Sequence, residues 1–368
     1  MELPQRDDYQ NIFIDDTPLL DVRAPVEYKQ GAFPRAKNLP LINDDERHNI
    51  GIRYKKKGQE KAVELGHELV SGETKESRIS DWTTFTNNNP NGVLYCFRGG
   101  MRSEISQQWI YDNTGVAYPR VKGGYKAMRR YLIEKLDRSA KELNPVVLSG
   151  RTGVGKTQLL QLIDTKIDLE HIYHHRGSAF GKHITPQPNQ IDIENNLSIK
   201  LMKFFREGQK TLVFEDESSS IGSRRIPECL INSLKQSSIV LLESTVRERV
   251  EIIYDEYITE ALDEHQQALG DSAGFDTWAN NLYTALENIQ KRLGGQHYKA
   301  IKSILEYAIN NHRVTGNAID HKAWIHDLLV GYYDPMYDYQ LSKKSDRIVF
   351  RGDRDAVLEY LKASTGVD

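Results

Sequence analysis

The chain has 368 residues, and its 49 lysines and arginines nearly balance 52 aspartates and glutamates, so the net charge is −3. At about 100–200 residues per domain, two domains are expected. With 39% hydrophobic and 27% charged residues, the composition excludes a disordered chain. The charge balance excludes a uniformly basic surface but leaves room for a local basic patch.

No apolar run approaches the roughly 18–20 residues that span a bilayer, so no membrane association is expected. The first ten residues, MELPQRDDYQ, have neither a basic start nor an apolar core, and a signal peptide is not predicted. The two cysteines, Cys96 and Cys229, are too few for a disulfide framework or a cysteine-rich zinc site. These features predict a cytoplasmic protein.

In chain order, the first half alternates short apolar strands with helices. Residues 18–22 and 92–96 have the composition of buried strands. Apolar residues at near-helical spacing predict a helix over 60–71. A further helix over 103–113 is expected to stop at Gly115, because glycine accepts the left-handed conformation that ends many helices.

The second half repeats this alternation after a polar stretch at 136–145, which we interpret as a linker because Pro145 interrupts a helix. Domains are therefore expected at 1–135 and 146–368. Alternating strands and helices predict an α/β fold with parallel sheets. The predicted elements of this half are strands at 146–149, 211–215, 238–242 and 347–350, a helix at 157–164, and an almost entirely helical region at 246–330.

Residues 150–157, called the phosphate loop below, match the pattern G-x-x-x-x-G-K-[ST] between a strand and a helix. The glycines let backbone N–H groups surround an anion, Lys156 adds a positive charge, and the Thr157 hydroxyl can ligate Mg²⁺. The pattern predicts a bound di- or triphosphate and leaves open whether it is hydrolysed. The predicted ligands are Gly150, Thr152, Gly153, Val154, Gly155, Lys156 and Thr157.

Two acids, Glu215 and Asp216, end the strand at 211–215, where phosphate-loop proteins place a second carboxylate of the metal site. The sequence leaves open which of them acts, and also whether the turn is merely solvated. Arg247 and Arg249 follow the strand at 238–242 and could reach a phosphate or be ordinary surface arginines.

Residues 96–103, called the cysteine loop below, also connect a strand to a helix. The helix N-terminus and the flanking Arg98 and Arg102 favour the thiolate form of Cys96. Gly99 and Gly100 allow the loop to curl, so that its amides face an anionic or persulfide species. A buried inert thiol is the alternative, and the two arginines and two glycines disfavour it.

Several segments of the first half resemble a rhodanese domain, which carries sulfur or selenium on its loop cysteine. They are Asp21-Val-Arg23, Glu27-Tyr28, Gly31, Pro34-Arg-Ala36, Asn38-Leu-Pro40 and the cysteine loop. A rhodanese domain followed by a phosphate-loop domain resembles the tRNA 2-selenouridine synthase family over essentially the whole chain. In the second half, 144–153, 175–181, 215–217 and 221–222 support this resemblance.

The resemblance implies an enzyme that acts on 2-thiouridine at the wobble position of tRNAs for Lys, Glu and Gln. A geranyl group from geranyl diphosphate is attached to the sulfur and is then exchanged for selenium from selenophosphate. No tightly bound cofactor is implied; Mg²⁺ at Thr157 is the expected ion, and the enzyme that makes selenophosphate is an expected partner. The resemblance also points to Gly66 in the selenium step.

This implied chemistry suits both loops. Lys156 and the loop amides would neutralise the departing diphosphate without any need for ATP. Cys96 would act as nucleophile or selenium carrier, with Arg98, Gly99, Gly100 and Arg102 around the selenophosphate anion. The loop at 175–181, with Arg176, Ser178 and Phe180, is expected to close over the phosphate or prenyl ligand.

A tRNA partner predicts a basic surface. Residues 120–141 hold eight basic residues against two acids, which suits RNA phosphates or an ordinary solvated helix face. The candidate RNA contacts are Lys122, Lys126, Arg129 and Arg130, together with Tyr337 and Tyr339 for base stacking. The four tyrosines of 332–339 could instead line a slot for the geranyl chain or pack in the core. The histidines at 174, 175 and 183 lack metal-ligand spacing, so no structural metal is predicted.

Two other functions compete with the tRNA-modifying transferase. One is a rhodanese-type sulfurtransferase fused to an ATP- or GTP-dependent kinase-like domain, which nucleotide turnover would reveal. The other is a sensor that uses the phosphate loop as a ligand switch; the intact Cys96 loop argues against it.

Overall fold

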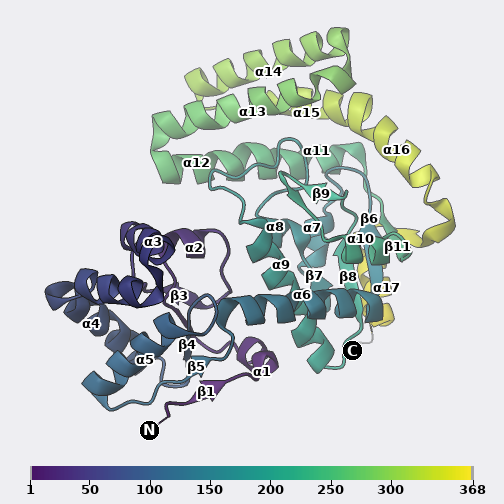
Figure 1. Ribbon diagram of the computed structural model, residues 1–368. Helices are drawn as coiled ribbons and strands as arrows, with labels where there is room; N and C mark the ends of the chain where they lie inside the picture. The colour runs from purple at the N-terminus through teal and green to yellow at the C-terminus, as the bar shows by residue number, and fades with distance from the viewer. Residues whose placement is uncertain (1, 366–368) are drawn as a thin grey trace. The chain divides into compact units, whose positions relative to one another are not determined.

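The computed structural model describes residues 2–365 and divides into two compact units (Figure 1). The first unit runs to Ser139 and also includes Asn189–Arg206, and the second comprises Ala140–Pro188 and the chain from Glu207 onward. Among the described helices, none combines the length and the apolar character needed to cross a membrane.

A five-stranded parallel sheet forms the centre of the first unit, in the order β1-β5-β4-β2-β3. The cysteine loop leaves the carboxyl end of β4, the middle strand, whose three residues are fully buried. The strands are β1 (Gln5–Arg6), β2 (Leu19–Asp21), β3 (Ala36–Asn38), β4 (Val93–Tyr95) and β5 (Arg120–Val121).

Helices surround this sheet, and the longest of them, α3, has a clear start signal and an interruption. Its N-cap residue Asn43 accepts a hydrogen bond from the Glu46 amide, and the Glu46 carboxylate accepts one from the Asn43 amide, each at 2.8 Å. Gly58, with φ of +80°, breaks α3 into two helical segments. The helices are α1 (Tyr9–Ile14), α2 (Pro25–Lys29), α3 (Asp44–Leu69), α4 (Gly72–Asn88), α5 (Met101–Thr114), α6 (Gly124–Glu142) and α9 (Gln190–Arg206).

A buried ion pair holds the strand ends of this unit together. The Arg23 guanidinium donates to Asp21 Oδ2 at 2.6 Å, and both side chains are essentially inaccessible to solvent. The Tyr95 hydroxyl donates to the same carboxylate at 2.8 Å, and the Tyr125 ring lies 3.8 Å from the guanidinium carbon. Because every charge has a close partner, the pair is tolerated in the core, and the Asp-Val-Arg segment has a structural role beneath the cysteine loop.

The second unit contains another five-stranded parallel sheet, in the order β12-β11-β6-β8-β7. The phosphate loop leaves the central strand β6, and β8 lies directly beside β6, with Glu215 opposite Leu148. The strands are β6 (Asn144–Ser149), β7 (Lys166–Ile167), β8 (Thr211–Glu215), β11 (Ser238–Leu242) and β12 (Ile348–Gly352), with a small antiparallel hairpin of β9 (Ser220–Ile221) and β10 (Arg224–Arg225).

The helices between residues 246 and 342 gather on one side of its sheet (Figure 1), whereas the last helix packs against β8, β11 and β12. Two segments among them, 255–260 and 329–333, have the wider π-helical turn. The helices are α7 (Lys156–Leu160), α8 (Leu169–Tyr173), α10 (Glu228–Leu234), α11 (Val246–Tyr254), η1 (Asp255–Glu260), α12 (Ala261–Leu269), α13 (Asp271–Leu293), α14 (Gly295–Thr315), α15 (His321–Leu328), η2 (Leu329–Tyr333), α16 (Asp334–Ser342), η3 (Ser345–Arg347) and α17 (Arg354–Thr365).

The predicted α/β class with parallel sheets and a helical C-terminal region is confirmed. Gly115 ends α5 in the left-handed conformation, with φ of +71°. The predicted helix at 157–164 is too long, since regular helix ends at Leu160 and the next residues adopt tighter turns.

The expected linker at 136–145 is not an extended segment. Helix α6 continues to Glu142 and β6 begins at Asn144, so Leu143 alone separates them. Pro145 lies inside β6, at a position beyond the pairing with β11, where its missing N–H costs no ladder bond on that side. In addition, residues 189–206, expected in the second domain, belong to the compact first unit.

Candidate active sites

The phosphate loop has a compact conformation that requires glycine at Gly153. This residue has φ of +78°, and a Cβ there would lie 2.7 Å from the Ile253 side chain and 2.9 Å from the Arg249 carbonyl oxygen. The Lys156 ammonium folds back and donates to the Gly150 carbonyl at 3.1 Å. Helix α7 has only five residues, so its dipole adds little positive charge. The loop amides and Lys156 supply the positive field at this site.

Lys156 is buried among acidic side chains. Burial lowers the pKa of its ammonium, but Tyr337, Glu215, Glu217 and Glu170 outweigh burial and hold the pKa above its usual value. The group therefore stays charged and can pair with a phosphate inside the protein.

Three glutamates beside Lys156 form a cluster in which one carboxylate oxygen from each lies within 4.8 Å of the others. Burial, reinforced by the neighbouring carboxylates, raises the pKa of Glu170 and Glu215 to about 8 and that of Glu217 to about 7. The Thr157 hydroxyl donates to Glu170 at 3.1 Å, whereas both oxygens of the buried Glu215 carboxylate lack a hydrogen-bond partner in the described chain. Unpartnered buried oxygens are costly, and a divalent cation that prefers oxygen ligands would satisfy them. The donor set fits Mg²⁺.

The two acids at the end of β8 differ in their surroundings. Asp216 accepts hydrogen bonds from the Lys344 ammonium at 2.8 and 2.9 Å and from the Ser149 hydroxyl at 2.6 Å. Its charge is thus compensated by a cation. Of the pair that the sequence left open, Glu215 is the acid whose oxygens have no hydrogen-bond partner among residues 2–365.

A cavity of about 340 Å³ joins the phosphate loop to an aromatic wall. Its polar lining includes Lys156, Thr157 and the glutamates at 170 and 217. Largely uncharged side chains also line it: Ile252, Tyr257, Ile289, Tyr332, Tyr333, Met336 and Tyr337. One cavity therefore has room for both an anionic group and an apolar chain.

The loop at 175–181 borders this cavity through Arg176, Gly177, Ser178 and Ala179. One guanidinium nitrogen of Arg176 donates to Glu264 at 3.3 Å, and the other, Nη1, is buried without a partner among residues 2–365. The Ser178 and Tyr257 hydroxyls are hydrogen-bonded at 2.8 Å. Phe180 does not line the cavity but stacks on Trp324, with ring centroids 5.6 Å apart, so its place is in the packing of the helices.

Sequence reasoning missed Glu256 and Tyr257, which line this cavity from the π-helical segment η1. Tyr332 and Tyr333 line it from η2 and belong to the tyrosines at 332–339, for which a slot for the geranyl chain was one of the alternatives. Wider turns change which side chains face inward, and a π-helical turn leaves no periodic mark in the sequence. Glu217 follows the predicted strand at 211–215 and could have been suspected from that position, whereas no predicted strand ends near Glu170.

The arginines after β11 do not reach toward a phosphate. Arg249 is completely buried, donates from Nε to the Thr152 carbonyl at 2.8 Å and pairs with the Asp334 carboxylate at 2.6 and 3.0 Å. Arg247 is exposed on the surface of α11. Arg249 thus supports the phosphate loop from behind, by linking it to Asp334, and is not a ligand.

In the first unit, the cysteine loop holds Cys96 in a buried position, with 3% of its surface exposed. The thiol sulfur lies 3.3 Å from the Ser103 hydroxyl and 3.7 Å from the Gly100 carbonyl oxygen. Gly99 has φ of +68°, and a Cβ there would lie 2.6 Å from the Gly123 amide nitrogen, whereas one at Gly100 would enter open space. Only the first of these two glycines is required by the fold.

The two arginines of the cysteine loop differ in their surroundings. Arg102 is paired with Glu27 through hydrogen bonds of 2.5 and 3.0 Å, which compensates its charge. Arg98 is exposed and has no ion-pair partner within the described residues. Because Glu27 is 75 residues away in sequence, this neutralisation of Arg102 could not be seen beforehand, and of the two arginines Arg98 is the one left exposed.

A second cavity, of about 690 Å³, lies in the first unit between α3 and α5. Gly66, Met101 and Arg102 are part of its lining. A Cβ added at Gly66 would meet only the Ile50 side chain, at 3.6 Å, so a longer side chain there would extend into this space. The glycine therefore leaves the cavity open beside the cysteine loop.

The candidate RNA contacts are scattered, and most are occupied. Arg129 pairs with Glu194 and Asn195, Lys122 lies 3.7 Å from Asp7, and Arg130 lies 3.7 Å from Glu134. Lys126 is exposed without a partner in residues 2–365. Tyr337 lines the 340 Å³ cavity of the second unit, whereas Tyr339 is exposed beneath Lys343, whose ammonium lies 4.0 Å from its ring centroid.

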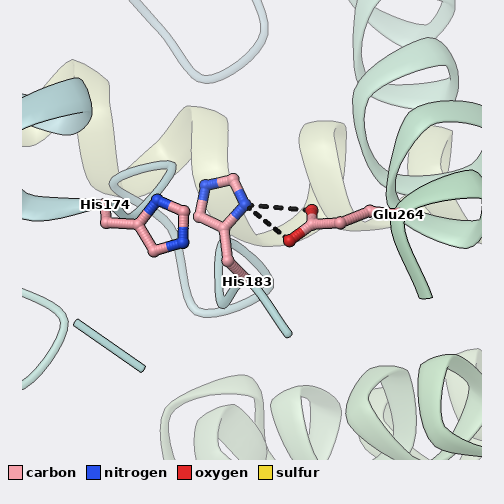
Figure 2. A group of neighbouring side chains, drawn as sticks. All are labelled: His174, His183 and Glu264. Carbon is pink, nitrogen blue, oxygen red and sulfur yellow. Dashed lines mark hydrogen bonds and ion pairs between the residues drawn. The ribbon is translucent and has the colours of Figure 1, made fainter. Parts of the chain in front are cut away.

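The histidines near Arg176 form a small polar cluster with α12, although their sequence spacing does not suggest one. His183 Nδ1 lies 3.0 Å from a Glu264 carboxylate oxygen, and the imidazoles of His174 and His183 stack with centroids 4.2 Å apart (Figure 2). His174 Nε2 is also 2.6 Å from the Thr185 hydroxyl. Since ligand lone pairs lie in the ring planes, nearly parallel stacked rings cannot both aim at one ion without turning. The arrangement ties the loop to α12 through hydrogen bonds.

Similarity to known proteins extends over nearly the whole chain. A family described as "tRNA 2-selenouridine synthase AAA domain" matches residues 143–366. A protein of Hahella chejuensis named tRNA 2-selenouridine synthase is 48% identical over 98% of this chain and 94% of its own length. Proteins of the same name from Marinobacter nauticus and a Sulfurovum species are 45% and 46% identical, each over 98% of this chain and 98% and 99% of their own lengths.

Proposed function

The chain belongs to the tRNA 2-selenouridine synthase family, enzymes that modify tRNA, and we propose that its two units divide this conversion between them. The second unit transfers a geranyl group from geranyl diphosphate to the sulfur of wobble 2-thiouridine in tRNAs for Lys, Glu and Gln. The first unit then introduces selenium from selenophosphate. A tRNA substrate and two free cysteines support a cytoplasmic location.

One observation carries the first step: the phosphate loop and the tyrosine-methionine wall line the same cavity. A prenyl diphosphate is an anion joined to an apolar chain, so it matches a cavity lined by both the phosphate loop and aromatic side chains. The cavity volume of about 340 Å³ lies within the range of ligand sites for small molecules.

Geranyl transfer exchanges one bond for another. The uridine sulfur forms a bond to C1 of the geranyl group, the C1–O bond breaks, its electron pair leaves with diphosphate, and the N3 proton of the base is released. Lys156, the loop amides and the unpaired Nη1 of Arg176 stabilise the charge that develops on the leaving group. Bound Mg²⁺, held by Thr157, Glu170, Glu215 and Glu217, would add positive charge at that place.

Selenium transfer also exchanges one bond for another. A C2–Se bond forms, the C2–S bond breaks, geranyl thiol leaves, and hydrolysis of the Se–P bond releases phosphate. Cys96, buried at the end of β4, is the proposed nucleophile: its thiolate adds to C2 and displaces geranyl thiol, and the selenium of selenophosphate then displaces the thiolate. Arg98 with the amides of Gly99 and Gly100 receives the anion. The Arg102–Glu27 pair shapes this site rather than binding the anion.

Mass spectrometry of the wobble nucleoside tests this proposal. The purified protein is incubated with 2-thiouridine tRNA, geranyl diphosphate, selenophosphate and Mg²⁺, first without ATP. Formation of 2-selenouridine supports the proposed reaction. Unchanged 2-thiouridine from folded protein, both without and with ATP, would contradict it and favour the sulfurtransferase joined to a kinase-like domain.

A further inference from the structure

We infer that the tRNA docks on the first helical segment of α3 in the first unit, through Arg53, Tyr54, Lys55, Lys56 and Lys57. The nucleoside to be modified then enters the 690 Å³ cavity that this segment borders. The inference rests on tRNA being the substrate and adds where it binds for the selenium step. It differs from the 120–141 segment, for which the sequence left RNA binding and an ordinary solvated helix face open.

The charges on this segment are not compensated. Residues 47–59 contain no acid, and Lys55, Lys56 and Lys57 are all exposed. Neither these lysines nor Arg53 has an ion-pair partner among residues 2–365. Free, exposed cations can bind the phosphates of an RNA backbone, and their binding releases the counterions of the RNA.

The segment at 120–141 differs in this respect. Arg120 donates to the Gly99 carbonyl at 2.7 Å and lies 3.2 Å from Glu104, and Lys135 contacts Gln10 and the Tyr131 ring. Arg129 is paired with Glu194, and Arg138 and Lys141 also interact with neighbouring groups. Most cations of this segment already interact with other groups of the protein. The number of basic residues in the sequence is therefore larger than the number of cations available to RNA phosphates.

Apolar side chains next to the lysines give the docking surface a second component. Ile52, Tyr54 and Met101 are 40%, 56% and 39% exposed, and all three line the 690 Å³ cavity. Large apolar side chains gathered in the open at one hollow commonly mark a binding site. An exposed tyrosine beside cations is also the usual platform for an unpaired RNA base.

The cavity itself connects this surface to the cysteine loop. Tyr54 and Lys55 lie on its α3 side, and Met101 and Arg102, from the loop and the start of α5, lie on another. Its floor is apolar, with Ile42, Val70 and Trp109 among the lining residues. The site therefore offers cations at its entrance for the RNA phosphates. It also offers an apolar interior for a base that carries an apolar substituent.

A structural role for the lysines must also be considered, because they lie in the last turn of a helical segment that ends at Gly58. Cations at such a position stabilise the helix dipole. Stability and RNA binding therefore have to be measured together.

The test compares two triple variants with equal loss of charge, Lys55→Gln/Lys56→Gln/Lys57→Gln and Lys122→Gln/Lys126→Gln/Arg130→Gln. Binding of an anticodon stem-loop containing 2-thiouridine is measured by fluorescence anisotropy at several salt concentrations. The α3 variant should bind at least about ten-fold more weakly, and the slope of log K against log salt should fall by about 2–3. The charge-preserving Lys55→Arg/Lys56→Arg/Lys57→Arg variant should bind like the wild type.

A second variant tests the apolar component. Tyr54 is exposed, so Tyr54→Ala should fold normally; it should weaken RNA binding several-fold, whereas Tyr54→Phe, which keeps the ring, should not. Thermal melting of every variant separates lost binding from lost structure.

The outcomes separate this inference from the proposed function. Wild-type binding that the α3 variant retains, or that only the 122–130 variant loses, would overturn the docking surface and leave the function standing. Failure of the wild type to bind the RNA would contradict both. Binding of phosphatidylserine vesicles through these lysines, with RNA binding unaffected in the variant, would assign the surface to lipid and overturn the inference.

Discussion

Arg249 spans the space between the phosphate loop and α16, since it donates to the Thr152 carbonyl at 2.8 Å and holds the Asp334 carboxylate with two further hydrogen bonds. The guanidinium is inaccessible to solvent and the carboxylate is 13% exposed. α16 also pairs with the loop through Arg151 and Asp338, at 2.6 Å. The shape of the loop therefore depends on an element almost 200 residues downstream.

We predict that Arg249→Met destabilises the protein by about 3–5 kcal/mol, because the Asp334 charge is left in a buried place without its partner. Affinity for geranyl diphosphate should fall as well, since the Thr152 carbonyl loses its donor. Urea denaturation and calorimetric titration measure the two effects. The double variant Arg249→Met/Asp334→Leu should recover much of the stability but not the affinity. A loss below about 1 kcal/mol in Arg249→Met alone would contradict the supporting role of Arg249.

Removing a carboxylate from the acidic cluster should change the response to divalent cations. We expect Mg²⁺ to raise the melting temperature of the wild type, and Glu215→Gln to abolish this rise because the two unpartnered oxygens are lost. Asp216→Asn is the matched control: its acid is engaged by Lys344, so the variant should keep the response to Mg²⁺. An unchanged response in Glu215→Gln would exclude Glu215 as a ligand.

The same cluster predicts how stability depends on pH without a cation. The pKa of Glu215 is about 8 in the folded protein against an ordinary 4.5, so the folded state binds more protons in this interval. The contribution of Glu215 to the free energy of unfolding should be fully present below pH 4.5 and should be lost as the pH rises toward 8. Glu215→Gln should flatten the pH dependence of unfolding measured in urea with chelator present.

The two loops should fail separately. Cys96→Ala is expected to abolish selenium incorporation while geranyl transfer continues, and Lys156→Ala is expected to lose geranyl transfer because the charge that binds diphosphate is gone. Mass spectrometry of the nucleosides distinguishes S-geranylated uridine from 2-selenouridine in each variant. Loss of geranylation in folded Cys96→Ala, or normal geranylation in Lys156→Ala, would contradict the division of steps.

His321 should make the helical region sensitive to acid. Burial, with a contribution from His312, lowers the pKa of His321 to about 3, and Trp324 donates to its Nδ1 at 3.0 Å. The unfolded chain takes up this proton near pH 6.5, so stability should be lost as the pH falls from 6.5 toward 3, at up to about 1.4 kcal/mol per pH unit. Urea unfolding of His321→Gln at several pH values should show a smaller slope of stability against pH than unfolding of the wild type.

Strands and loops with local signals were predictable. The strands at 211–215 and 238–242, the phosphate loop and the end of α5 at Gly115 are each encoded within a few neighbouring residues. Such signals survive folding because they depend on apolar runs and backbone conformation rather than on distant partners.

The electrostatics of the two sites could not be predicted in the same way. Whether Arg102 is free depends on Glu27, and whether Asp216 is free depends on Lys344, 128 residues later. The basic count of 120–141 likewise ignored the acids that fold against it. A charge in the sequence becomes a ligand only if tertiary structure leaves it unpaired, and that is a property of the fold.

Helix α9 makes the two units depend on each other in the order of the sequence. Its Asn195 and Asp192 bond to the main chain of Ala32, and Glu194 pairs with Arg129, so the first unit needs a helix encoded between two segments of the second. A single cut between residues 135 and 146 would produce one fragment that lacks part of its core and another with a stray helix. Separation of the two halves into independent proteins, in evolution or in the laboratory, would require moving α9, so simple gene fission is disfavoured.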